Sequence, residues 1–133
     1  MKQIVHLNEQ TKHEIVKMEH KCEKIGKRLS KRHEKAFLTL GETIIIEFIR
    51  EKKGKPVVQE DLFSDGYESY LEIGVEKEGL YFPNGHLPIW KCKQEMFHHV
   101  GKLINLSTEA IENKLEKMIT EIYEDHRSEL KEK

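Results

Sequence analysis

The chain has 133 residues, of which 37% are hydrophobic and 35% charged, and its formal net charge is −1. This length predicts one domain that is large enough to bury a hydrophobic core. The low fraction of apolar residues suits helices with one buried face better than a β-sandwich. A uniformly basic binding protein is excluded by the net charge. The charges are nevertheless segregated, because 12–35 holds nine Lys or Arg and four Glu, whereas 55–78 holds two Lys and seven acids.

The two cysteines, Cys22 and Cys92, form no CxxC pair and no framework of spacings, so we expect reduced thiols in the cytoplasm. The N-terminus lacks the apolar region that a signal peptide needs. The most apolar run, 36–49, is interrupted by Glu42 and Glu47 and is too short to span a bilayer. We therefore expect a soluble cytoplasmic protein with no membrane attachment.

The first predicted element is a long helix from Asn8, which can cap it, to Gly54. One unbroken helix of that length would measure about 65–70 Å, far more than a small domain, so a break is expected at Gly26 or Gly41. The segment 36–49 is apolar almost all round, which predicts the buried central helix of the core.

Residues 1–35 are predicted to form a basic amphipathic helical arm that leans out from an α+β core domain at 36–133, the whole being a single domain. An apolar seam follows the arm at helical spacing. If the helix stays straight, the arm extends beyond the core domain and its apolar seam is exposed to solvent. Such a stripe is unusual on a monomer, which predicts a homo-oligomer, most simply a homodimer. The predicted oligomer interface consists of Ile15, Met18, Cys22, Ile25 and Leu29.

A small three-stranded antiparallel meander is predicted after the long helix. Apolar and polar residues alternate over 71–76, and a second short strand follows at 80–82. Asn84 and Gly85 together predict a hairpin turn, and a third strand would run over 86–92.

Two C-terminal helices complete the predicted fold. Helical spacing returns over 94–104, and a second helix begins after Ser107 or Thr108, either of which can cap it, and runs to about Leu130. The expected fold is therefore α+β and mostly helical.

A line of cationic residues lies about a quarter-turn from the apolar seam on the same helix. Six positive side chains along about 27 Å suit a phosphate backbone, because each neutralised phosphate releases counterions. Nucleic acid is thus the first expected partner, bound with weak sequence specificity because the stretch lacks the Asn, Gln and Thr that read base edges. The predicted contacts are Lys17, Lys21, Lys24, Arg28, Lys31 and Lys35. The opposite flank carries Glu19, Glu23 and Glu34.

An acidic protein surface is the alternative partner for this line. The chain would then be a protein–protein interaction module, an adaptor or inhibitor that uses the same helix or the acidic meander. In that case Asp65, Glu68, Glu72 and Glu76 become central. A purely structural reading is also open, in which the basic helix packs against the acidic last helix of the same chain.

Enzymatic signatures such as GxGxxG, the P-loop, HExxH and GxSxG are missing from the sequence, so we expect no enzyme. Glu95-x-x-His98 has the spacing of a di-iron motif, but such a site needs two copies. We expect no metal and no cofactor. The aromatic residues of the meander are expected to pack in the core rather than to stack on bases. They are Tyr81, Phe82 and Trp90.

Overall fold

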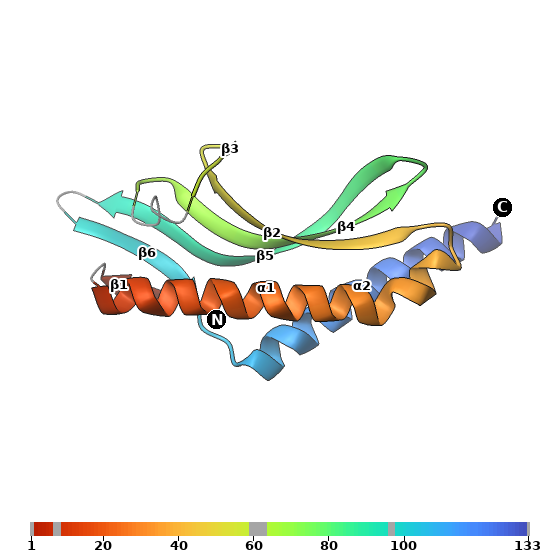
Figure 1. The fold of residues 1–133 in the computed structure, drawn as a ribbon, viewed down its shortest axis with the longest axis horizontal. Helices are drawn as coiled ribbons and strands as arrows, with labels where there is room; N and C mark the ends of the chain where they lie inside the picture. Colours follow the sequence, from red (N-terminus) through yellow and green to blue (C-terminus); the bar gives the residue numbers. More distant parts are fainter. Residues whose placement is uncertain (1, 7–8, 59–63, 96–97, 133) are drawn as a thin grey trace.

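The computed structural model describes residues 2–6, 9–58, 64–95 and 98–132, with side chains over 9–58, 64–92 and 101–130. An antiparallel sheet forms one layer, and two long helices lie side by side on one of its faces (Figure 1). The sheet has six strands in the order β1-β6-β5-β4-β2-β3. The elements are β1 (Lys2–His6), α1 (Glu9–Leu38), β2 (Thr43–Lys52), β3 (Lys55–Pro56), β4 (Tyr67–Lys77), β5 (Leu80–Glu95), β6 (His98–Ile104) and α2 (Thr108–Glu132). The α+β class is confirmed, whereas several predicted elements are not.

The chain changes from helix to strand at Gly41. This residue has a φ of +74°, in the left-handed region that favours glycine, and α1 has already ended at Leu38. The predicted core helix over 36–49 is therefore wrong. Three successive β-branched isoleucines begin at Ile44, and such residues favour a strand. By contrast, α1 runs unbroken through Gly26, where a Cβ atom would lie only 2.9 Å from a methyl carbon of β2.

The predicted meander is a longer and more irregular sheet. A two-residue turn at Glu78 and Gly79, with φ values of 54° and 78°, joins β4 to β5. The second hairpin predicted at Asn84 and Gly85 is wrong, because β5 continues through it and Gly85 lies opposite Ile73. Two register shifts interrupt the β4–β5 pairing. Such bulges bend a sheet, and the sheet curves away from the helices (Figure 1).

One C-terminal helix is present instead of two. The segment predicted as a helix over 94–104 ends β5 and forms β6, apart from residues 96 and 97, which lie outside the described residues. Its backbone pairs with β5 on one side and β1 on the other. The helix expected next is confirmed as α2, and the Ser107 hydroxyl accepts the Ala110 N–H at 3.1 Å as a cap. The cap predicted at Asn8 lies outside the described residues.

The core lies between the helices and the sheet, and the apolar seam of α1 belongs to it. Four seam residues are at most 2% exposed, and the fifth packs against the same cluster. The segment predicted as an arm therefore packs along the sheet. The homodimer stays a prediction, but an exposed seam no longer supports it. The seam residues are Ile15, Cys22, Ile25, Leu29 and, partly buried, Met18.

The aromatic residues of the predicted meander divide between core and surface. Trp90 is 1% exposed and packs in the core, as expected. Tyr81 and Phe82 are 37% and 48% exposed, so the expectation of core packing fails for both. In the described part of the chain, neither helix is long and apolar enough to cross a membrane.

Candidate nucleic-acid interface

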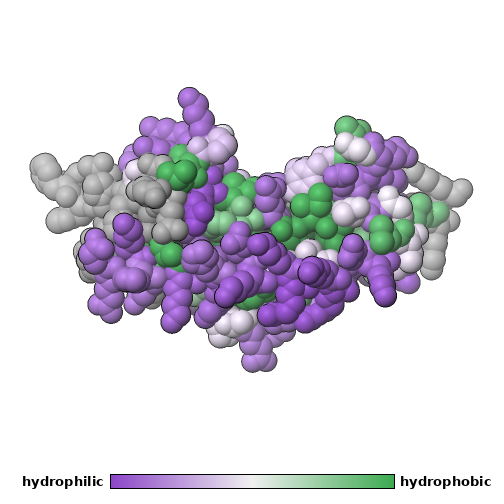
Figure 2. Space-filling view, viewed as in Figure 1, coloured by the Kyte–Doolittle hydropathy of each residue, from purple (hydrophilic) through white to green (hydrophobic). Residues whose placement is uncertain are grey.

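The predicted cationic line lies on the solvent side of α1, because the opposite side of the helix is buried against the sheet. Four of its lysines are exposed, and Lys21 is half-buried. Within the described ranges, none of the five lysines lies within 4.0 Å of a carboxylate oxygen. The helix edge of the molecule is accordingly strongly hydrophilic (Figure 2). The exposed lysines are Lys17, Lys24, Lys31 and Lys35.

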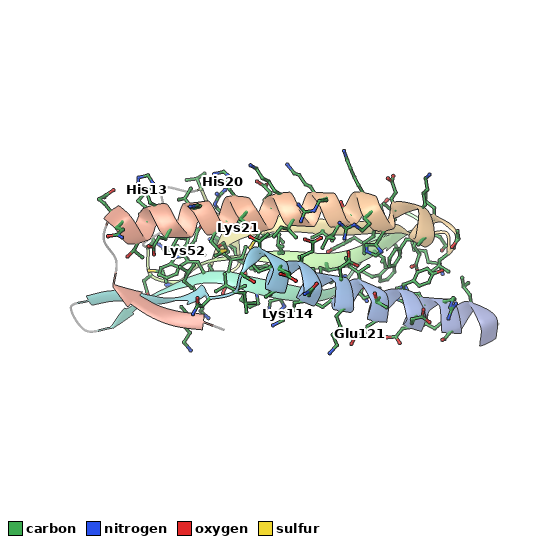
Figure 3. All side chains as sticks on the ribbon, turned by 90° about the horizontal axis from the view of Figure 1, so that it is seen from below. His13, His20, Lys21, Lys52, Lys114 and Glu121 are labelled. Carbon is green, nitrogen blue, oxygen red and sulfur yellow. The ribbon has the colours of Figure 1, made fainter. Side chains whose placement is uncertain are left out.

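A groove of about 570 Å³ lies beside the cationic line of α1, at the point where α1 is next to Thr108, the first residue of α2. All of its ionisable side chains are lysine, arginine or histidine. The positive end of the α2 dipole lies at the same place, and it favours negative ligands. Figure 3 shows the two helices side by side, with Lys21 and His20 on α1. The groove is lined by Lys17, His20, Lys21, Lys24, Ile25, Arg28 and Thr108.

Farther along α1, the basic residues are used to hold the two helices together. Arg28 Nη2 lies 2.8 Å from Glu112 Oε2, and Arg32 Nη1 lies 2.7 Å from Glu116 Oε1. His33 Nε2 lies 2.8 Å from the other oxygen of Glu116. Packing on the acidic last helix, one of the open interpretations of the sequence, thus accounts for Arg28 but not for the five lysines.

The electrostatics of Glu116 reflect this pairing. Partial burial opposes ionisation, but the contacts from His33 and then Arg32 outweigh it and hold the pKa of Glu116 below its ordinary value. The carboxylate stays charged at neutral pH and fixes the α1 side chains that approach it. Two parts of the predicted cationic line therefore differ in their availability to a ligand. The part near Lys21 makes no ion pair within the described ranges, whereas Arg28 is paired with Glu112 of α2.

Two residues of the groove were not predicted from the sequence. His20 follows His13 by seven residues and so lies near one helical line with it. Thr108 was predicted only as a possible cap. No local pattern places it beside Lys21, since the two are brought together by the packing of α2 on α1.

Both cysteine thiols are buried. Burial raises the pKa of the Cys22 thiol to about 12 and that of Cys92 to about 11, so both thiols are protonated at neutral pH. In the described ranges, no three His, Cys, Asp or Glu side chains are grouped so as to hold a metal ion. The side chains of Glu95 and His98 lie outside these ranges.

Three of the four acids named for the alternative function, Glu68, Glu72 and Glu76, are at alternate positions of β4 and so lie on one face of the sheet. Glu68 and Glu72 line a groove on the other face of the sheet, whereas Asp65 and Glu76 are exposed outside it. No protein family matches the chain, and neither does any curated protein or any solved structure.

Proposed function

We propose that this chain is a small, non-enzymatic accessory or regulatory protein that binds the phosphate backbone of nucleic acid. The observation that supports it is the groove at the start of α2, whose ionisable lining is entirely basic. Lys17, Lys21 and Lys24 supply mobile ammonium groups there, and the α2 N-terminus adds fixed positive potential. Lys31 and Lys35 extend the surface along α1.

The spacing of the lysines suits a regular polyanion. Lys17, Lys21 and Lys24 are three or four residues apart, and so are Lys31 and Lys35. This spacing is about 4.5–6 Å along the helix, so neighbouring ammonium groups within each set can reach neighbouring phosphates. Long lysine side chains act as point charges and do not impose a fork geometry. Arg28, which has such a fork, donates to Glu112 instead. Binding should therefore depend strongly on salt and weakly on sequence.

The test is a titration of duplex DNA and of single-stranded RNA at two salt concentrations with the variant Lys21→Glu/Lys24→Glu. If each lysine meets one phosphate, the variant should lose about two units of the salt slope on duplex DNA and bind all sequences less tightly. The matched control is Lys55→Glu/Lys77→Glu, which makes the same change in net charge on the sheet. It should bind nearly as the native protein does.

Two results would contradict the proposal. One is equal weakening by both double variants, which would indicate net charge rather than a site. The other is no binding by the native protein at low salt. The protein–protein interaction function would then be favoured, with an acidic protein surface as the partner of the same lysines.

A further inference from the structure

A second groove, of about 480 Å³, lies on the face of the sheet that the helices leave open. Figure 1 shows the sheet curving upward at both ends on this side, and the space-filling view is hollowed there (Figure 2). The residues that carry its chemistry come from four strands. They are Glu51, Glu68, Tyr70, His86, Lys91 and Lys102. A third acid, Glu72, also lines the groove and lies opposite His86.

Four of these residues form one row across the sheet. Glu51 of β2 lies opposite Glu68 of β4, Glu68 lies opposite Lys91 of β5, and Lys91 lies opposite Lys102 of β6. The row therefore reads two acids and then two lysines. Neighbouring strands are about 4.8 Å apart, so the centres of the acidic pair and the basic pair are separated by about 10 Å.

This order is unfavourable for the sheet itself. Like charges directly opposite each other on adjacent strands destabilise the pairing, and the row contains two such pairs. An alternating order of acid and lysine would place opposite charges together at every step. The only opposite-charge step, Glu68 to Lys91, measures 3.9 Å, and the Lys91 side chain is 64% exposed, so it contributes little. Local rules are broken in this way mainly at functional sites.

Tyr70 orients one of the two acids. The Tyr70 hydroxyl donates to Glu51 Oε2 at 3.1 Å, and the Tyr70 ring packs edge-on against His86 with 5.7 Å between centroids. Partial burial and a hydrogen bond with Glu51 raise the pKa of Glu68, although Lys91 opposes the shift.

We propose that this groove binds a small dipolar ligand, with a guanidinium or ammonium group over Glu51 and Glu68 and a carboxylate over Lys91 and Lys102. The chemistry is that of arginine or lysine with a free α-carboxylate. Two sources carry it, the free amino acid and the C-terminal residue of a peptide. Tyr70 and His86 offer ring faces for the aliphatic part and the cation. The proposal is independent of the nucleic-acid surface, which lies on the helix side.

The experiment is calorimetric titration of the native protein with four probes. They are L-arginine, a tetrapeptide ending in arginine with a free carboxylate, the same peptide amidated, and agmatine, which lacks the carboxylate. Heat from arginine alone identifies the free amino acid as the ligand, and tighter binding of the free-carboxylate peptide identifies a C-terminus. No heat from either at millimolar concentration overturns the proposal.

Variants then assign the two ends of the ligand. Glu68→Gln should weaken arginine and agmatine alike by about tenfold or more, because a charge-assisted contact is lost. Lys91→Gln should weaken arginine but leave agmatine unchanged. Glu76→Gln, on the same strand but outside the groove, is the matched control and should bind as the native protein does. Equal effects of Glu68→Gln and Glu76→Gln, or of Lys91→Gln on both probes, would overturn the assignment. Circular dichroism confirms that each variant is folded.

Discussion

Among the side chains that the structure describes, Glu19 is the most deeply buried charged one. It lies on α1 among exposed charges, yet its side chain has no accessible surface. The Tyr67 hydroxyl donates to one of its oxygens at 2.8 Å, and Arg50 Nη2 donates to the other at 3.3 Å. The Arg50 guanidinium also lies 4.7 Å from the centre of the Phe48 ring. Two strands thus satisfy one buried carboxylate.

Replacing Arg50 by Met should leave Glu19 buried without a cation. Breaking a buried pair from one side costs about 3–5 kcal/mol, because an uncompensated charge remains inside. The free energy of unfolding from urea titration measures it. The double variant Glu19→Gln/Arg50→Met should recover part of the loss, since no buried charge is left. A loss below about 1 kcal/mol for Arg50→Met alone would show that Tyr67 suffices.

Glu68→Gln should have the opposite effect on stability. Its removal relieves the like-charge pair with Glu51, so we expect a gain of about 0.2–1 kcal/mol at neutral pH. A raised pKa means that native Glu68 contributes stability while protonated and loses it as pH rises through the folded pKa. Glutamine does not titrate. The gain should therefore appear as pH rises and vanish in acid, and thermal unfolding at several pH values measures it.

At the scale of elements, polar contacts join α2 to α1 at one end and to the turn that follows α1 at the other. Arg28, Arg32 and His33 meet α2 near its start. Near the other end, His126 Nδ1 of α2 lies 2.7 Å from a carboxylate oxygen of Glu42, which follows α1. Between these contacts, Phe37 packs edge-on against an aromatic ring of α2.

Glu116→Gln tests the first of these contacts. The pKa of Glu116 is lowered, so its contribution is present above the unfolded pKa and is lost as pH falls through the folded pKa. Glu116 is partly exposed, and after allowance for solvent screening the contact with His33 is worth about 0.5 kcal/mol. The variant should be less stable than the native protein at neutral pH and equal to it in strong acid. Glu121→Gln, on the outside of α2, is the control and should change nothing.

The sequence predicted the elements whose pattern is local. The amphipathic spacing of α1, its apolar seam and the Ser107 cap of α2 are all visible within a few turns of chain. The segments 36–49 and 94–104 were misassigned because a short apolar run fits a buried strand as well as a helix. Their structure is decided by partners far away in sequence, such as β1 for β6. Local periodicity contains no information about such pairing.

Over the whole molecule, the same distinction holds for the candidate sites. The cationic line is a property of one helix and could be read directly. The basic groove requires Thr108 beside Lys21, and the row across the sheet requires four strands in one register. Neither arrangement follows from spacing along the chain. The prediction of an exposed seam failed for a related reason, because the sheet that covers it lies later in the sequence.

The two-layer arrangement also determines what remains accessible in an assembly. The lysines of α1 and the groove proposed to bind a dipolar ligand lie on opposite sides of the sheet. A molecule held on a nucleic acid by α1 would therefore turn this groove outward. Several copies bound along one strand would then display a row of identical binding sites. Such a row would bind multivalent partners. A partner with two or more matching termini would dissociate far more slowly than a partner with a single terminus, because each bound terminus raises the effective concentration of the others at the neighbouring sites.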